Sequence, residues 1–530
     1  MDSKYILTYD IGTTGVKTCV FSVDETIHLL GAASAGYGLY VWPDGRAEQK
    51  PDEWWDAMCE TTRKALKDAK VKADKIEGVS FCSQMQGIVL VDQDGNALRP
   101  AMSYMDQRAR EEIKKGIQYG VQIAGANVTK LLKALRITGA APVSVKDPVW
   151  KYKWVEAHEP EIFAKTYKWL DVKEYLICRM TGEFCMTPDS AFSALLYDIH
   201  TDNWSREMCD MLGVQMKHLP QIKPCTAKIG ELREAQAKEL GLAPGTAVFG
   251  GGGDATLIGV GAGAVADGDT HVYCGTSGWV STVTDHSIVD VATMIAAIVG
   301  AEKGTYNYFA ELETAGKCLE WVKDHLALDE IGIYLKKEHV AESYESAYTS
   351  LYDYMSKVID EVPAGANGVI FTPWLHGNRC PFEDPNARGM FFNLSLDSGK
   401  SDMIRAVVEG TCYHLRWFIE AQNNKVKTSD TLRFVGGGAL SPVTCQILAD
   451  VTGKTVQTVP SPQNVGAVGA AVTVAVGLGV KSSVKEAKSL IPIDATYRPN
   501  PANRAVYDKG YKVFKRLYKS NKDNFAALNG

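Results

Sequence analysis

The stretch YILTYDIGTTGVKTCVFSV (residues 5–23) decides the fold, because two β-rich runs flank a short turn of glycine and hydroxyl residues. A turn such as GTTG (12–15) joins two antiparallel strands into a hairpin. The stretch THVYCGTSGWVSTVT (270–284) repeats this arrangement with GTSG (275–278) at its turn. One copy lies near the start of each half of the chain, which predicts a duplicated domain.

Between and after these hairpins, helical patterns alternate with short β runs, as is typical of an α/β protein. The segment PDEWWDAMCETTRKALKDA (51–69) predicts a helix, because proline suits the first helical turn. The uncharged stretch 465–480 is shorter than the ~20 residues that cross a membrane, so it predicts a buried core helix. Helical spacing near the C-terminus recurs at Tyr507, Tyr511, Phe514 and Leu517.

Composition narrows the class of protein. The 530 residues exceed one ordinary core, so we expect at least two domains. We place the predicted division after residue 250, which gives domains at 1–250 and 251–530. A net charge of −6 without a long basic block argues against nucleic acid as a partner. The first ten residues lack a basic and then apolar leader, and the twelve cysteines form no CxxC pair. We therefore expect a cytoplasmic protein without a membrane partner; the oligomeric state stays open, with a homodimer as one option.

The segment LRFVGGGALSPVTCQILADVTG (432–453) predicts a strand, a glycine turn and a helix. Ser441 can cap the helix with Pro442 at its first position, and Gly453 can end it. A nucleotide can approach the backbone at such a Gly-rich turn before a helix N-terminus. The two hairpin turns are further candidates, because their N–H groups and hydroxyls can bind phosphate; ordinary polar turns are the alternative.

Two carboxylates are candidates for chemistry. Asp254 is the only charge in FGGGGDATLIGVGAG (249–263), where it can cap a helix or act as a general base in phosphoryl transfer. Asp10 ends the first predicted strand, where it can bind Mg²⁺ beside phosphates or simply start the turn. Lys17 adds a positive charge two residues after the first turn. Local sequence leaves these alternatives open.

Together with further motifs, these segments resemble the FGGY carbohydrate kinases, and within that family most of all the xylulokinases. The resemblance runs along nearly the whole chain. Besides the hairpins, the 249–263 segment and the glycine turn, it is carried by GRAEQKPDEWW (45–55), SQMQGIVLVDQDGNALRPAMSYMDQR (83–108), ETAGKCLEW (313–321) and FTPWLHGNRCPFEDPNARGMFFNLS (371–395).

The resemblance implies two actin- and Hsp70-like (ribonuclease H-like) α/β domains that flank a catalytic cleft. It implies transfer of the ATP γ-phosphate to a hydroxyl of a small ketose or polyol, with D-xylulose as the expected acceptor. Asp254 would be the base, and Asp10 would serve Mg²⁺. The sugar would meet Met85, Gln86, Asp106 and Asp254. The nucleotide and its phosphates would meet Thr13, Thr14, Lys17, Gly275, Thr276, Gly316, Gly437, Gly438 and Ala439.

The chain departs from the xylulokinase pattern on the sugar side. Gln86 stands where His is usual, Ala255 stands where Asn is usual, and YMDQR (104–108) replaces Trp-Asn-Asp-x-Arg. Because hydrogen-bonding groups discriminate strongly among hydroxylated substrates, another acceptor stays open: ribulose, L-xylulose, gluconate, a polyol or an autoinducer-type sugar.

Two alternatives come from other classes of protein. A non-kinase ATPase of the same fold would lack the substrate-side segment, and a sugar-binding regulator would not need both Asp10 and Asp254.

Overall fold

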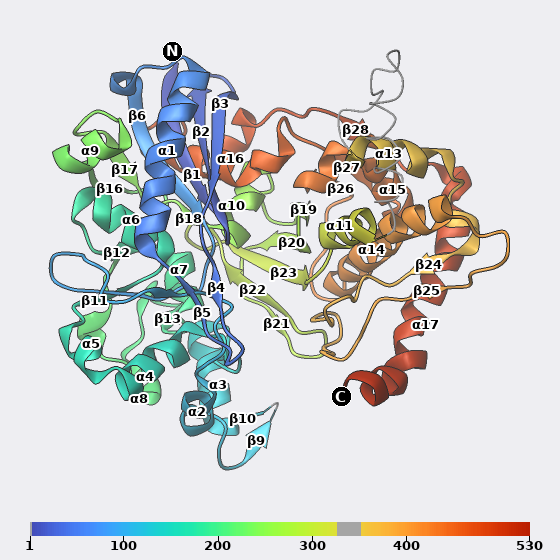
Figure 1. The fold of residues 1–530 in the computed structure, drawn as a ribbon, viewed down its shortest axis with the longest axis horizontal. Helices are drawn as coiled ribbons and strands as arrows, with labels where there is room; N and C mark the ends of the chain where they lie inside the picture. Colours follow the sequence, from blue (N-terminus) through green and yellow to red (C-terminus); the bar gives the residue numbers. More distant parts are fainter. Residues whose placement is uncertain (1–2, 124, 326–350) are drawn as a thin grey trace, which may run out of the picture.

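Two mixed β-sheets organise the computed structural model, which describes residues 3–123, 125–325 and 351–530 (Figure 1). The N-terminal sheet contains, in spatial order, β16 (Lys228–Glu231), β17 (Ala247–Phe249), β6 (Ile76–Ser83), β1 (Lys4–Ile11), β2 (Gly15–Val23) and β3 (Ile27–Gly36), with β18 (Gly252–Gly253) also paired to β6. The C-terminal sheet contains β21 (Val289–Asp290), β22 (Ile295–Val299), β23 (Tyr306–Leu312), β20 (Gly278–Thr284), β19 (Thr270–Cys274), β26 (Thr431–Val435), β27 (Thr455–Gln457) and β28 (Thr496–Tyr497).

The two sheets share one pairing pattern. In the first, β1, β2 and β3 pair antiparallel, β6 runs parallel to β1, and β17 runs parallel to β6. In the second, β19, β20 and β23 pair antiparallel, β26 runs parallel to β19, and β27 runs parallel to β26. An antiparallel strand follows in both, β16 beside β17 and β28 beside β27. This equivalence confirms the duplication that the two hairpins predict.

One face of the N-terminal sheet is covered by α1 (Pro51–Ala69), whose bounds are those predicted. Pro51 occupies its first turn, and its buried side includes Trp54, Trp55 and Met58. Burial of such large side chains stabilises the helix against the sheet by about 1.5–3 kcal/mol each. Beside α1 lie α6 (Val172–Thr181) and α9 (Glu234–Leu240).

The other face packs against α10 (Asp254–Gly261) and α16 (Val465–Gly477). The prediction of a buried core helix at 465–480 is thus confirmed for α16, which packs on β1 and β6 of the other half of the chain. A side chain at Gly261 or Gly469 would collide with backbone of the facing helix. These glycines let α10 and α16 touch, which fixes the start of α10 relative to the sheet.

In the C-terminal half, the predicted strand, turn and helix at 432–453 are confirmed. Ser441 caps α15 (Pro442–Thr452) by accepting the N–H of Thr444, and Gly453 ends it in the left-handed conformation. The predicted C-terminal helix is α17 (Arg504–Asn529), with the four expected side chains buried. The other helices of this half are α11 (Gly316–His325), α13 (Leu351–Glu361) and α14 (Lys400–Gln422).

Residues 40–49 and most of the residues between β6 and β16 form an added layer of helices and short strand pairs on the N-terminal half (Figure 1). Its helices are α2 (Arg110–Gly116), α3 (Val128–Thr138), α4 (Pro148–His158), α5 (Pro160–Lys165), α7 (Pro188–Ser193) and α8 (Arg206–Leu212). One small sheet has three strands, β4 (Tyr40–Val41), β5 (Ala47–Gln49) and β8 (Ala101–Met102). Four further sheets of this half have two strands each: β7 (Val89–Val91) with β11 (Lys168–Leu170), β9 (Gln122–Ile123) with β10 (Ala126–Asn127), β12 (Cys185–Met186) with β15 (Gln221–Ile222), and β13 (Tyr197–Asp198) with β14 (Asn203–Trp204). In the other half, β24 (Ile370–Phe371) pairs with β25 (Phe391–Phe392).

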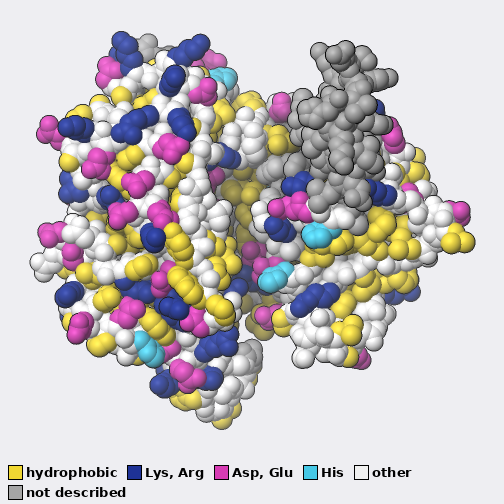
Figure 2. Space-filling model, viewed as in Figure 1, with side chains coloured by type: hydrophobic (Ala, Val, Ile, Leu, Met, Phe, Trp, Pro, Cys, Tyr) yellow, Lys and Arg dark blue, Asp and Glu magenta, His cyan; other side chains and the backbone are white. Residues whose placement is uncertain are grey.

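The surface is hollowed between the two halves (Figure 2). The core beneath this cleft contains side chains of both sheets, including Phe21 and Cys82 from the first and Trp279 and Val435 from the second. Among the helices of the described ranges, none has the length and apolar character required to cross a bilayer. The boundary at residue 250 stays a prediction.

Candidate active site

The second hairpin and the glycine turn lie together in the C-terminal half. The N–H of Gly316, at the start of α11, donates to the carbonyl of Gly275 (2.8 Å). A side chain at Gly316 would collide with that carbonyl, and a Cβ at Gly436 would lie 2.6 Å from the carbonyl of Cys274. The exposed turn residue Thr276 therefore shares a small region with the glycine turn, as a common phosphate and nucleotide site requires.

Around Gly437 no atom lies within 4 Å of an added Cβ, so the backbone there is open to a ligand. Gly438 packs closely on Cys274, and the Ala439 side chain is mostly buried. Gly437 thus offers the accessible backbone of this turn, while its neighbours hold the turn against β19. Their roles toward adenosine remain a prediction.

The first hairpin brings Asp10 and Lys17 opposite each other on β1 and β2, with Thr14 exposed at the turn. Thr13 is held from behind, because Gln49 Nε2 donates to its carbonyl oxygen (2.8 Å). Lys17 Nζ donates to the carbonyl of Gln463 (2.8 Å), which precedes α16. The predicted phosphate lysine thus links the hairpin to the returning C-terminal segment, and its contact with phosphate stays a prediction.

Asp254 is the first residue of α10, whereas Gly253 takes the N-cap position. Its Oδ1 accepts the N–H of Ala255 (2.7 Å). Burial raises the pKa of the Asp254 carboxyl to about 7, and the negative charges of Asp10 and Glu311 add to the effect. A carboxyl that titrates near neutrality suits a general base better than a helix cap, which is normally fully ionised.

Asp10 and Asp254 make a pair of carboxylates that lacks a protein counter-ion. Burial raises the pKa of Asp10, while the charge of Lys17 and a hydrogen bond from Cys82 oppose this rise. Among the described side chains, no Lys, Arg or His forms an ion pair with either carboxylate. A Cβ at Gly466 would lie 3.1 Å from Asp10 Oδ2, so the start of α16 closes tightly on Asp10.

This donor set fits Mg²⁺. The described residues contain no cluster of three or more His, Cys, Asp or Glu side chains able to hold a metal on their own. Mg²⁺ in phosphoryl-transfer enzymes usually takes one or two carboxylates and completes its shell with water and phosphate oxygens. Asp10 would supply such a ligand, and the ion would neutralise charge on the phosphates.

Two further side chains near Asp254, the acidic Glu311 and the aromatic Tyr104, were given no role in the sequence analysis. Glu311, at the end of β23, accepts Arg379 Nη1 (2.7 Å), and burial raises its pKa. Tyr104 OH lies 3.3 Å from Thr13 Oγ1, and its pKa is raised first by burial and then by Asp254 and Glu311. Because the charges of Asp254 and Glu311 both act on Tyr104, we assign these three side chains to one site. The alternating Glu-Leu-Glu at 311–313, just before the ETAGK motif, is the signal that could have revealed Glu311.

The predicted sugar contacts Met85 and Gln86 follow β6. A side chain at Gly253 would collide with Met85, so Met85 packs directly on the segment that precedes the carboxylate. Gln86 adopts a left-handed conformation (φ 63°), which is strained for a residue with a side chain. No hydrogen bond from the described protein reaches its side-chain amide, which leaves that amide able to meet a ligand.

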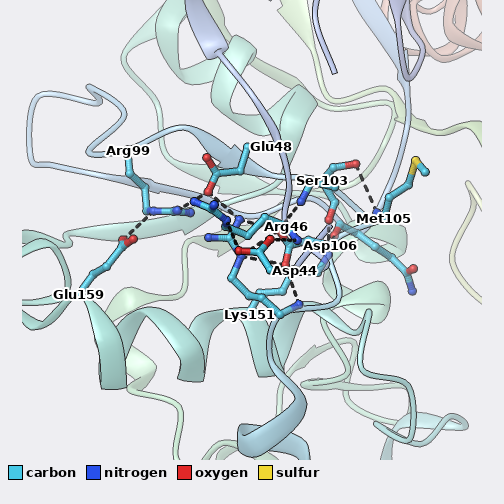
Figure 3. A network of polar contacts seen from close by, with 12 residues as sticks. Asp44, Arg46, Glu48, Arg99, Ser103, Met105, Asp106, Lys151 and Glu159 are labelled. Atoms are coloured by element: carbon cyan, nitrogen blue, oxygen red, sulfur yellow. Dashed lines mark hydrogen bonds and ion pairs between the residues drawn. The ribbon is translucent and has the colours of Figure 1, made fainter. Parts of the chain in front are cut away.

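Asp106 lies in a different environment from the one its predicted sugar contact suggests. Its side chain is fully buried, and its oxygens accept Arg108 Nη2 (2.7 Å) and the N–H of Ala47 (2.8 Å). Arg108 also pairs with Glu48 (2.6 Å), and Glu48 and Asp106 both belong to the network of Figure 3. Asp106 therefore holds the sugar-side loop in place here, and a direct sugar contact stays a prediction.

The arrangement can support phosphoryl transfer. Hairpin turns with exposed hydroxyls and N–H groups flank the cleft, Asp254 can accept the proton of an incoming hydroxyl, and Asp10 can bind Mg²⁺. In such transfers the protein mainly positions the reactants and neutralises charge.

Comparison with known proteins agrees with this geometry. Residues 5–261 match the model of the FGGY family of carbohydrate kinases, N-terminal domain, and residues 271–478 match that of its C-terminal domain. A xylulose kinase of Staphylococcus epidermidis is 28% identical over 530 residues, covering 100% of this chain and 99% of its own. A gluconokinase of Bacillus subtilis is 28% identical over 520 residues, covering 97% and 95%.

Solved structures agree on the fold. The ligand-bound xylulose kinase from Lactobacillus acidophilus aligns with a TM-score of 0.83 at 25% identity, covering 99% of this chain and 100% of that one. The actin- and Hsp70-like fold with two α/β domains is confirmed. The chain belongs to the FGGY family of carbohydrate kinases.

Proposed function

We propose that this carbohydrate kinase transfers the γ-phosphate of ATP, with Mg²⁺, to a hydroxyl of D-xylulose and forms D-xylulose 5-phosphate. The observation that carries the proposal is the Asp10 and Asp254 pair beside the first hairpin, with which no cationic side chain in the described part of the chain forms an ion pair. Asp254 would remove the proton of the acceptor hydroxyl. Asp10 would hold Mg²⁺, and the glycine turn would hold adenosine.

A relative from Staphylococcus epidermidis and one from Bacillus subtilis are both named xylulose kinase, and these names support a ketose as the acceptor. Gluconate is the rival acceptor, and it carries a carboxylate that needs a cation. Lys151 and Arg108, which contact the sugar-side loops, are already engaged with carbonyls and with Asp106 and Glu48. That arrangement favours a neutral acceptor. Twelve free cysteines support a reducing, cytoplasmic setting.

A screen of ADP release tests the acceptor. Purified enzyme with ATP and Mg²⁺ would be offered ketopentoses, polyols, gluconate and deoxysugars in turn. We expect D-xylulose to give the highest kcat/KM. A clear preference for gluconate or a polyol would replace the D-xylulose assignment while leaving the kinase activity in place.

The pH dependence of kcat/KM follows from the Asp254 environment. Because a general base acts only when deprotonated, and the pKa is raised to about 7, activity should fall tenfold per pH unit below pH 7 and level off above it. This decrease of kcat/KM below pH 7 should be absent from the residual activity of Asp254→Asn. A profile that stays flat through pH 7 in the wild-type enzyme would contradict this role.

Gln86 and Ala255 are predicted to set the choice of sugar. Gln86→His with Ala255→Asn restores the groups usual in xylulokinases, so kcat/KM for D-xylulose should rise relative to other sugars while the KM for ATP changes little. A hydroxyl left unpaired at such a site costs about 1–3 kcal/mol. Gln122→His, on exposed β9, is the matched control. An unchanged order of preference among sugars would show that these positions do not determine specificity.

A further inference from the structure

Two buried charged residues, Lys151 on α4 and Asp171 before α6, contact the backbone of the sugar-side loops. Lys151 is 0% exposed and Asp171 is 4% exposed, so neither can touch sugar or ATP. The proposed activity assigns them no role. Their contacts nevertheless converge on the segments that carry Gln86 and Tyr104.

Asp171 holds the Gln86 segment from one side. Its Oδ2 accepts the N–H of Gln86 (2.9 Å), and its Oδ1 accepts the N–H of Gly87 (2.9 Å). Oδ1 also accepts the N–H of Val172 (2.7 Å), which anchors the carboxylate to the start of α6. A Cβ at Gly87 would lie 2.7 Å from Oδ1, so this close approach needs the glycine.

Lys151 holds the same segment from the other side and joins it to a second loop. Its Nζ donates to the carbonyl oxygens of Gln86 (2.8 Å) and Ser103 (2.7 Å), the latter contact visible in Figure 3. Ser103 directly precedes Tyr104, whose hydroxyl lies 3.3 Å from that of Thr13. One ammonium thus fixes the spacing between the Gln86 loop and the Tyr104 loop.

The hydrogen bonds of Lys151 and Asp171 to these loops form a clamp, and the strained conformation of Gln86 explains why it is needed. A left-handed φ at a residue with a side chain persists only where the surroundings hold it. Here the N–H and the C=O of the same residue are each held by a buried charge. Without them, the peptide would relax and the Gln86 side chain would change its position.

We propose that Lys151 and Asp171 are positioning residues, which hold the Gln86 and Tyr104 loops in the geometry that binds the acceptor sugar. The inference rests on the proposed sugar site at Gln86. It predicts an effect on sugar binding and not on ATP, because the side-chain hydrogen bonds of both residues, apart from the anchor of Asp171 at Val172, go to the sugar-side loops.

The test is Lys151→Met, with Lys153→Met as the matched control on the same helix. Lys153 instead bonds Glu156 and the carbonyl of Gly213. Losing hydrogen bonds to a buried charge should raise the KM for sugar about 10-fold in Lys151→Met while the KM for ATP stays within about twofold. Lys153→Met should change neither. Both KM values are measured with the sugar that the wild-type enzyme prefers. The test therefore does not depend on the D-xylulose assignment, which the acceptor screen tests by itself.

Two further measurements keep the proposal testable if Lys151→Met does not fold. Asp171→Asn keeps the shape but cannot accept both N–H groups, so it should also raise the KM for sugar selectively. In the wild-type enzyme, burial lowers the pKa of Lys151 to about 8 although Asp106, Asp171 and Asp147 favour its charge and Lys146 opposes it. The KM for sugar should therefore rise above pH 8 in the wild-type enzyme, and Lys153→Met should keep this rise.

Selective loss of sugar binding supports the clamp. A parallel rise in both KM values would indicate general damage to the fold and overturn it. An unchanged KM for sugar in a folded Lys151→Met or Asp171→Asn enzyme would overturn it as well.

Discussion

Replacing the Asp254 carboxylate by an amide, in Asp254→Asn, is expected to lower kcat by roughly 10²–10⁴-fold, the range for loss of a general base. The amide has nearly the same shape, and its oxygen can still accept the N–H of Ala255, so α10 should begin unchanged. The KM values for ATP and sugar should therefore change little. Steady-state kinetics of the purified variant measure all three quantities.

Asp267→Asn is the control for this substitution, since Asp267 is an exposed aspartate in the loop that follows α10. It should keep wild-type kcat. If Asp254→Asn turned over near the wild-type rate, Asp254 would be left with a role only in the first turn of α10.

The second large effect is expected for Asp10→Asn, which should lower kcat/KM for ATP at least about 100-fold. The amide lacks the negative charge that would hold Mg²⁺ beside the phosphates. Raising the Mg²⁺ concentration should recover part of the loss. A titration of activity against Mg²⁺ at saturating sugar measures both effects.

Asp74→Asn, at an exposed aspartate just before β6, provides the comparison. Its Mg²⁺ dependence should match that of the wild-type enzyme. An Asp10→Asn enzyme with an unaltered Mg²⁺ dependence would exclude Asp10 from the metal site and leave it as a turn residue.

The parts of the fold that local sequence could predict are those fixed by local chemistry. Gly453 and Pro442 bound α15 because a left-handed C-cap favours glycine and a first turn accepts proline. The two hairpins were predictable for the same reason. Their duplication then indicated the second sheet, because equal hairpins imply equal strand neighbours.

The rest depends on contacts between distant segments. Nothing local in 465–480 tells that α16 returns to β1 and β6 of the other half, since an apolar helix can pack on many surfaces. The same holds for Asp106, which pairs with Arg108 and the N–H of Ala47, and for the hydrogen bonds of Lys151 and Asp171 at Gln86. Sequence could indicate that these side chains matter, but not which partner each one finds.

The central claim is that the γ-phosphate passes from ATP to a sugar hydroxyl in this cleft. Phosphorus NMR of a reaction with ATP, Mg²⁺ and D-xylulose measures it most directly, because ADP, sugar phosphate and inorganic phosphate give separate signals. The account predicts one sugar phosphate for each ADP in the wild-type enzyme and neither product at a comparable rate in Asp254→Asn. ADP accompanied by inorganic phosphate, with no sugar ester from D-xylulose or any other acceptor, would contradict it.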